Sequence, residues 1–180
     1  MNRRRNLIVG GVVATAAAAA GGAFGFWRIK SSEEDAAATA ALFALTLPDP
    51  AGAPQALSQW KGRPLVVNFW APWCAPCVEE LPDLQHVREE YRARGVEIIG
   101  LGIDSAAHIR QFQSDHQITL PLLVAGADGS SIGDRLGNKT GALPYTVLIS
   151  SNGGVAERKL GRIRPDELRR WLDVHAASTG

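Results

Sequence analysis

The chain of 180 residues contains only two cysteines, and both lie in the segment Trp73-Cys74-Ala75-Pro76-Cys77. A spacing of two residues can close a small disulfide ring, and it is also the spacing of half a metal site. A tetrahedral zinc site needs four ligands, whereas the sequence has no second cysteine pair and its four histidines are scattered. The pattern therefore favours thiol–disulfide chemistry at Cys74 and Cys77 over a structural disulfide or a metal site.

The cysteines follow an apolar, β-branched run from Pro64 to Trp70, which predicts a buried strand. After them, apolar residues recur at 78, 81, 84, 87 and 91, which is the spacing of one helix face. This spacing predicts a helix over about residues 75–93, with Gly95 beyond its end and Pro82 as a kink inside it. The two cysteines are therefore expected where a strand ends and a helix begins.

The start of a helix suits a reactive thiol, because the unpaired N–H groups of the first turn carry partial positive charge and stabilise a thiolate. We expect Cys74, at or just before the first turn, to be exposed, low in pKa and the attacking nucleophile. We expect Cys77, inside the helix, to be more buried and to resolve the mixed disulfide. Pro76 falls in the first turn, where its missing N–H has no cost.

The rest of the pattern predicts one α/β domain with a central mixed β-sheet and helices on both sides. The turn signal Asn152-Gly153-Gly154 predicts a hairpin near the C-terminal end. The other expected strands are a weak edge strand at 42–47 with a short partner at 55–58, and strands at 96–103, 120–124, 144–149 and 155–159. The other expected helices are 106–115, about 131–136 and 165–175.

The N-terminus predicts a membrane or export segment. Arg3, Arg4 and Arg5 precede Leu7–Trp27, a stretch without charged residues that is long enough to cross a bilayer. We favour an uncleaved signal-anchor over a removed signal peptide, and an export signal of the twin-arginine type stays open. We therefore divide the chain into a signal-anchor segment at 1–30, a tether at 31–41 and a domain at 42–180 outside the cytoplasm.

The charge of the exported part argues against nucleic acid as a partner. Residues beyond 30 include 14 basic and 18 acidic side chains, so this part is net acidic although the whole chain carries +1. A small basic cluster near the C-terminal end is expected to be a solvated hairpin face. That cluster consists of Arg158, Lys159, Arg162 and Arg164.

From about residue 42 to 175 the chain resembles the TlpA/ResA branch of the thioredoxin superfamily, which are membrane-tethered thiol–disulfide oxidoreductases. The motifs that carry the resemblance are Val67–Cys77, Glu80-Leu81-Pro82, Gly141–Thr146 and Asn152-Gly153 with Val155. The resemblance implies a thioredoxin-like fold and a cis peptide bond before Pro144, beside the dithiol. It also implies that a substrate strand pairs with the backbone before Pro144, with Leu143, Trp73 and Pro76 as the substrate-binding residues.

One departure from the thioredoxin pattern is informative. Thioredoxins carry a buried acid at the position of Asn68, and the resemblance implies that Glu80 takes the place of that acid. Glu80 lies one helical turn after Cys77 and can face its thiol, where a raised pKa would suit acid–base work near neutral pH. The alternative is that Glu80 only complements the helix dipole. Its neighbour Glu79 is expected to be a surface acid.

The resemblance also bears on rival activities. A peroxidase of the peroxiredoxin type has Thr or Ser three residues before its reactive cysteine, where this chain has Ala71. A copper carrier of the Sco type has three residues between its cysteines and a distal histidine, whereas this chain has two residues between them and no histidine near Pro144. A copper-binding metallochaperone remains the rival from a different class. No cofactor and no metal are expected.

The direction of electron flow is expected to be reductive, because Ala75 and Pro76 place no charge between the cysteines to stabilise a thiolate further. A disulfide oxidase remains the alternative. The resemblance implies a membrane thiol transporter of the CcdA/DsbD type as electron donor. It implies substrates such as apocytochrome c or copper-site assembly proteins, in a pathway of cytochrome c biogenesis or copper-site assembly.

Overall fold

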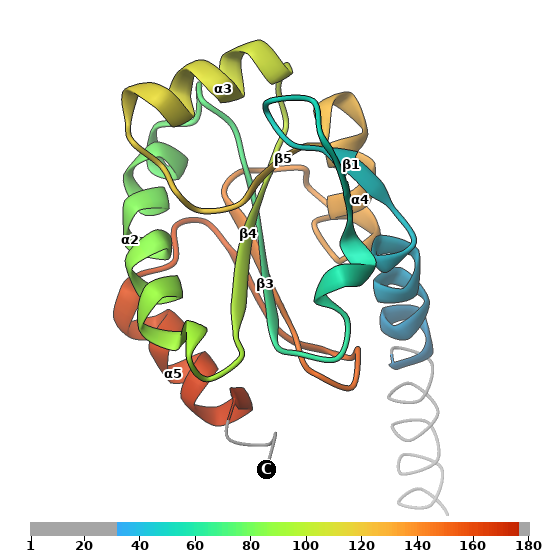
Figure 1. Ribbon diagram of the computed structural model, residues 1–180. Coiled ribbons are helices and arrows are strands. Elements are labelled where there is room, and N and C mark those ends of the chain that lie inside the picture. The colour runs from blue at the N-terminus through green and yellow to red at the C-terminus, as the bar shows by residue number, and fades with distance from the viewer. Residues whose placement is uncertain (1–31, 177–180) are drawn as a thin grey trace, which may run out of the picture. The chain divides into compact units, whose positions relative to one another are not determined.

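The computed structural model describes residues 32–176 of the chain. Its centre is a five-stranded mixed sheet in the order β5-β4-β3-β6-β7, and Figure 1 shows helices on both sides of it. Strand β3 pairs in parallel with β4 and antiparallel with β6. The sheet strands are β3 (Leu65–Trp70), β4 (Glu97–Gly102), β5 (Leu122–Val124), β6 (Tyr145–Ile149) and β7 (Val155–Leu160).

Two helices cover one face of the sheet, α2 (Ala75–Arg92) and α5 (Pro165–Ala176), as Figure 1 shows. Helix α3 (Ala106–Asp115) follows β4, and α4 (Gly129–Arg135) lies on the other side. These elements confirm the expected α/β architecture. The observed helices and sheet strands lie within a few residues of the expected ranges, because apolar runs and helical spacing mark them strongly in the sequence.

The alternation of side chains along β3 divides the core between the two faces. Val66 and Trp70 belong to the apolar cluster under α2 and α5, whereas Leu65, Val67 and Phe69 belong to the cluster on the other face. All six β3 residues are buried, as expected for a central strand covered on both sides. Since side chains alternate, Asn68 is directed to the same face as Val66 and Trp70, which is the face of α2.

The N-terminal edge of the domain differs from expectation. Residues 32–43 are helical, where we expected a tether at 31–41 and an edge strand beginning at Leu42. Ala38, Leu42 and Phe43 are buried in the cluster on the face opposite α2. Alanine has the highest helix propensity, and the part of this helix over residues 36–43 gains its stability by burying one side against the domain.

A two-stranded sheet follows this helical segment. It consists of β1 (Thr46–Pro48) and β2 (Pro54–Ala56), which pair antiparallel with Leu47 opposite Gln55. The expected strand at 42–47 is therefore shorter and starts later, and the expected partner at 55–58 ends early because Leu57–Trp60 form a 3-10 helix. Both strands lie outside the five-stranded sheet.

The expected signal-anchor at residues 1–30 lies outside the described residues. Within residues 32–176, no helix is both long and apolar enough to cross a membrane.

Candidate active site

Cys74 and Cys77 lie at the start of α2 and form a disulfide with an S–S distance of 2.03 Å and a Cα–Cα distance of 5.2 Å. Cys74 is the N-cap residue, in extended conformation, and Pro76 lies at the first or second helical position. Cys74 keeps 7% of its surface exposed, whereas Cys77 has none. The order of exposure agrees with our expectation, although Cys74 is more buried in the disulfide form than we expected.

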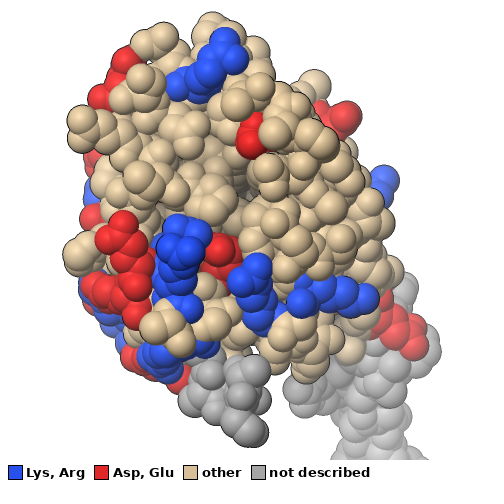
Figure 2. Space-filling model, viewed as in Figure 1, with Lys and Arg blue, Asp and Glu red and all other residues tan. Residues whose placement is uncertain are grey.

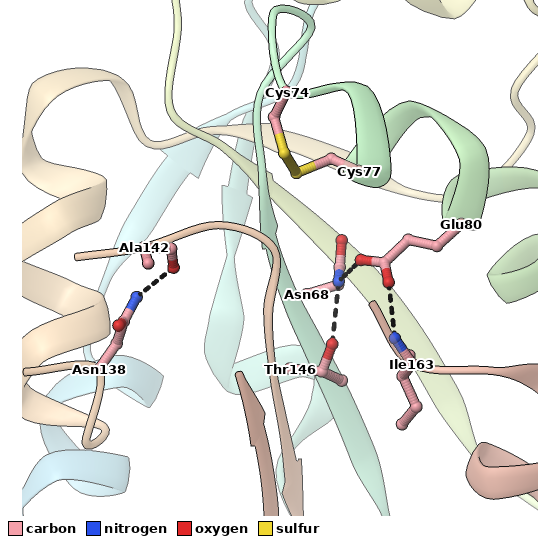
Figure 3. Close-up of a disulfide and its surroundings, with 8 residues drawn as sticks. All are labelled: Asn68, Cys74, Cys77, Glu80, Asn138, Ala142, Thr146 and Ile163. Carbon is pink, nitrogen blue, oxygen red and sulfur yellow. Dashed lines mark hydrogen bonds between the residues drawn. A yellow bond between two sulfur atoms is a disulfide. The ribbon is translucent and has the colours of Figure 1, made fainter. Parts of the chain in front are cut away.

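The loop before β6 contains the expected cis-proline. The Leu143–Pro144 peptide bond is cis, as expected, and Pro144 is buried at the start of β6. The Asn138 side chain stabilises this loop, because its Nδ2 donates a hydrogen bond to the carbonyl of Ala142 at 3.0 Å (Figure 3). Gly141 has a φ of +65°, a conformation that L side chains rarely adopt, so the loop turns there.

Glu80 lies below the cysteines in Figure 3, and its side chain is fully buried. Its Oε1 accepts a hydrogen bond from Asn68 Nδ2 at 2.7 Å, and its Oε2 accepts one from the backbone N–H of Ile163 at 2.9 Å. Asn68 Nδ2 also donates to Thr146 Oγ1 at 3.0 Å. The Glu80 carboxyl on α2 thus binds directly to β3 and to the loop after β7, and Asn68 connects it to β6.

Burial raises the pKa of Glu80 from 4.5 to about 7. The hydrogen bonds from Ile163 and Asn68 and the charge of Arg162 oppose this rise, whereas Asp83 adds to it. A carboxyl with a pKa of about 7 changes its protonation state near neutral pH, which is the property of an acid–base group. Glu80 is the sixth residue of α2 and lies beyond its first turn, so a contact with the helix N-terminus does not account for this pKa.

A family model described as Redoxin matches residues 34–172, which is most of the chain. This chain belongs to the redoxin family. Two relatives are named thiol-disulfide oxidoreductase ResA. The one from Oceanobacillus iheyensis is 33% identical over 118 residues, which cover 65% of this chain and 59% of that protein. The one from Geobacillus kaustophilus is 29% identical over 136 residues, 75% of each chain.

Solved structures establish the fold of this redoxin. A thiol:disulfide interchange protein of the thioredoxin family from Chlorobium tepidum superposes with a TM-score of 0.66 at 21% identity, covering 73% of this chain and 92% of that one. StoA from Bacillus subtilis gives a TM-score of 0.57 at 19% identity, with 71% and 94% covered. The expected thioredoxin-like fold is confirmed. The match to the Oceanobacillus ResA spans less than two thirds of that protein's length.

The surface beside the redoxin disulfide is open and apolar. Trp73, directly before Cys74, has 68% of its surface exposed, and Pro76 is also exposed. Leu143, next to the cis bond, is half-buried and packs against both core clusters. Of the three residues that we expected to bind substrate, Trp73 and Pro76 thus adjoin the cysteines in the chain, and Leu143 precedes the cis bond.

Two members of the buried network were not singled out by the sequence, Thr146 and Ile163. Thr146 lies directly opposite Asn68 in the β3–β6 pairing, so strand alternation could have placed it on the α2 face. Ile163 contributes only its backbone N–H from the loop between β7 and α5, and no side-chain pattern marks such a contact. Glu79, by contrast, is exposed and pairs with Arg162 at the surface, as a surface acid should.

Among residues 32–176 there is no group of three or more His, Cys, Asp or Glu side chains that could hold a metal ion.

Proposed function

We propose that this redoxin is an exported thiol–disulfide oxidoreductase that reduces disulfides in other proteins. The observation that carries the proposal is the cysteine pair at the start of α2, with Glu80 fully buried beneath it. A structural disulfide would need neither a buried carboxyl with a pKa of about 7 nor an exposed tryptophan beside it. The names of the ResA relatives support the same chemistry.

The first step uses the reduced dithiol form. The thiolate of Cys74 attacks one sulfur of the substrate disulfide, the substrate S–S bond breaks, and a mixed disulfide forms between Cys74 and the substrate. The released substrate sulfur leaves as a thiolate and takes a proton from water. The N-cap position supports this role, because the free N–H groups of the first turn of α2 stabilise negative charge on Cys74.

The second step releases the substrate. Cys77 loses its thiol proton to the carboxylate of Glu80, and its sulfur attacks Cys74 Sγ. The mixed disulfide breaks, the second substrate sulfur leaves as a thiolate and is protonated, and the Cys74–Cys77 disulfide forms. Overall two electrons and the proton of Cys77 pass from this chain, and the second proton of the reduced substrate comes from water. The raised pKa of Glu80 supports its role as the base in this step.

The substrate is expected to dock on the open surface around Cys74. Trp73, Pro76 and Leu143 offer apolar contact, and the backbone before Pro144 supplies groups that an extended substrate segment can pair with. We propose apocytochrome c and copper-site assembly proteins as the substrates, on the basis of the resemblance to the TlpA/ResA branch.

The proposed location is the outer side of the cytoplasmic membrane. The uncharged stretch Leu7–Trp27 behind Arg3–Arg5 supports a single-pass anchor, or a signal segment that is removed after export. A reductase in an oxidising compartment needs electrons from inside the cell. We therefore propose a membrane thiol transporter of the CcdA/DsbD type as the donor that reduces the Cys74–Cys77 disulfide.

An insulin-reduction assay with the full chain in detergent tests the activity, with dithiothreitol as the electron source. The wild-type chain should accelerate precipitation of the insulin B chain, and Cys74→Ser should abolish the acceleration. An acceleration by Cys74→Ser equal to that of the wild type would contradict the proposal, as would an inert wild-type chain.

A trapping experiment identifies the substrates. Cys77→Ser cannot complete the second step, so it should hold substrates as mixed disulfides on Cys74 that dithiothreitol releases. Cys74→Ser is the matched control, because it keeps one cysteine but lacks the attacking one. Equal capture by both variants would argue against Cys74 as the nucleophile.

A further inference from the structure

Asn68 is a fully buried amide whose orientation is fixed by its neighbours. Its Nδ2 group donates to Glu80 Oε1 on α2 and to Thr146 Oγ1 on β6. A carboxylate accepts hydrogen bonds and does not donate them, so the group that faces Glu80 is the nitrogen. The oxygen of the same amide must then point the other way.

That oxygen, Asn68 Oδ1, is buried and has no hydrogen-bond partner among the described residues. In Figure 3 it points away from Thr146, toward the side on which the Cys74–Cys77 disulfide lies. A buried acceptor without a partner is costly, and each such atom calls for a physical reason. The sulfur atoms of a disulfide have no hydrogen to donate, so the oxidised protein cannot satisfy this oxygen from the cysteines.

The reduced protein has such a donor. We propose that Asn68 Oδ1 accepts a hydrogen bond from the Cys77 thiol in the dithiol form, and that Asn68 is a positioning residue for the resolving cysteine. The inference rests on the proposed function, since it assigns a role within the same thiol–disulfide cycle. Cys77 is the donor because it is the fully buried cysteine, one helical turn from Glu80 on α2.

The chemistry of the cycle fits this contact. Reduction breaks the Cys74 Sγ–Cys77 Sγ bond, and an external dithiol supplies two electrons and two protons. One proton binds Cys77 and enters the hydrogen bond to Asn68 Oδ1. In the resolving step the same proton moves to the Glu80 carboxylate. Asn68 holds that carboxylate by a hydrogen bond from Nδ2, the end of the amide opposite Oδ1. Asn68 carries no proton itself, because it only orients the donor and the acceptor.

A thermodynamic consequence separates this role from a structural one. The hydrogen bond exists only in the reduced form, so Asn68 stabilises that form relative to the disulfide. An amide that merely ties β3 to α2 and β6 would stabilise both forms alike. Removing the oxygen should therefore shift the thiol–disulfide equilibrium toward the disulfide, whereas a general loss of packing should leave the equilibrium unchanged.

The first experiment measures this equilibrium for the full chain in detergent against glutathione. Asn68→Leu, which has a similar volume and no acceptor, should favour the disulfide about tenfold more than the wild type, equivalent to about 30 mV for two electrons. Thr146→Val is the matched control, because it removes a partner of Nδ2 and leaves Oδ1 in place; its equilibrium should move less than twofold. If Asn68→Leu does not fold, Asn68→Ala serves in its place.

The second experiment observes the hydrogen bond directly. In Cys74→Ser, Cys77 is the only thiol of the chain, so the infrared S–H stretching band reports on it alone. The band should lie at lower frequency than in the double variant Cys74→Ser/Asn68→Leu. Asn68→Asp in the same background retains a carboxyl oxygen at this position and should keep the low frequency.

An S–H band that does not move in Cys74→Ser/Asn68→Leu would overturn the inference. A Thr146→Val equilibrium shifted as far as that of Asn68→Leu would also overturn it. Neither measurement depends on a protein substrate. A chain that is inert toward insulin but shows the band shift would refute the reduction of protein disulfides and leave the role of Asn68 supported.

Discussion

Glu80 is an acid without exposed surface, and its hydrogen-bond partners are the Asn68 amide and the backbone N–H of Ile163. Both partners hold the carboxyl in place without neutralising it. Arg162, whose charge lowers the pKa of Glu80, is exposed and pairs with Glu79 and Asp83. Such a site lets the carboxyl gain and lose a proton near neutral pH, which the resolving step requires.

The first prediction at this scale concerns stability. Because the pKa of Glu80 is about 7 in the folded chain and about 4.5 for an ordinary, solvated glutamate as in the unfolded chain, the folded chain binds more protons between these pH values. The stabilising effect of the neutral carboxyl is present below about pH 4.5 and is lost as the pH rises through 7. The free energy of unfolding of the wild type, relative to Glu80→Gln, should fall by about 3 kcal/mol across this window.

Urea unfolding of both chains at a series of pH values checks this result. Glu79→Gln is the matched control, since Glu79 is exposed and should give a curve parallel to that of the wild type. Parallel curves for the wild type and Glu80→Gln would show that the carboxyl has an ordinary pKa.

A second prediction concerns the rate of insulin reduction. The wild-type rate should rise as Glu80 ionises near pH 7, because the carboxylate accepts the proton of Cys77. Glu80→Gln should lose this inflection, and Glu79→Gln should retain it. Superimposable profiles for the wild type and Glu80→Gln would reduce Glu80 to an acid that complements the helix dipole.

A third prediction concerns the two thiols. In the reduced chain at pH 7, iodoacetamide should alkylate Cys74 before Cys77, because Cys74 is the N-cap of α2 and Cys77 has no exposed surface. Peptide mass spectrometry after a short exposure gives the ratio, and the denatured chain should show equal labelling. Faster modification of native Cys77 would reverse the roles of the two cysteines.

At the scale of elements, α2 and the loop before β6 bring the reactive groups together, and both could be predicted. The strand over 64–70, the helix after it and the proline before β6 are marked by short local patterns. The helical segment at 32–43 could not be predicted as readily, because its small residues give a weak pattern. Its stability comes from contacts with residues far along the chain, such as the hydrogen bond from Thr39 Oγ1 to the carbonyl of Gly153 at 2.7 Å.

The packing of this segment yields a prediction of its own. Leu42 is 2% exposed, so Leu42→Ala should lower the free energy of unfolding by about 2–5 kcal/mol. Leu160→Ala is the matched control, because Leu160 is 50% exposed and should have a much smaller effect. Chemical unfolding of the full chain measures both. Equal, small effects would indicate that the segment around Leu42 does not pack firmly against the domain.

At the scale of the whole molecule, many charged side chains form ion pairs with side chains of opposite charge. On the face in Figure 2, basic and acidic side chains gather together in the lower part, while the upper part is mostly uncharged. In the basic cluster near the C-terminal end, Lys159 pairs with Glu167, and Arg162 pairs with Glu79 and Asp83. These pairs agree with the expected solvated face.

The central claim is that electrons flow from this redoxin to its substrates, and its reduction potential tests that claim most directly. The full chain in detergent is equilibrated with mixtures of reduced and oxidised glutathione, and the oxidised fraction is measured by thiol alkylation. With no charged residue between the cysteines, the potential should lie near that of thioredoxin, about −270 mV. A value near that of DsbA, about −120 mV, would contradict the account and identify the chain as an oxidase. The two outcomes differ by about five powers of ten in the equilibrium constant, since about 30 mV corresponds to a factor of ten.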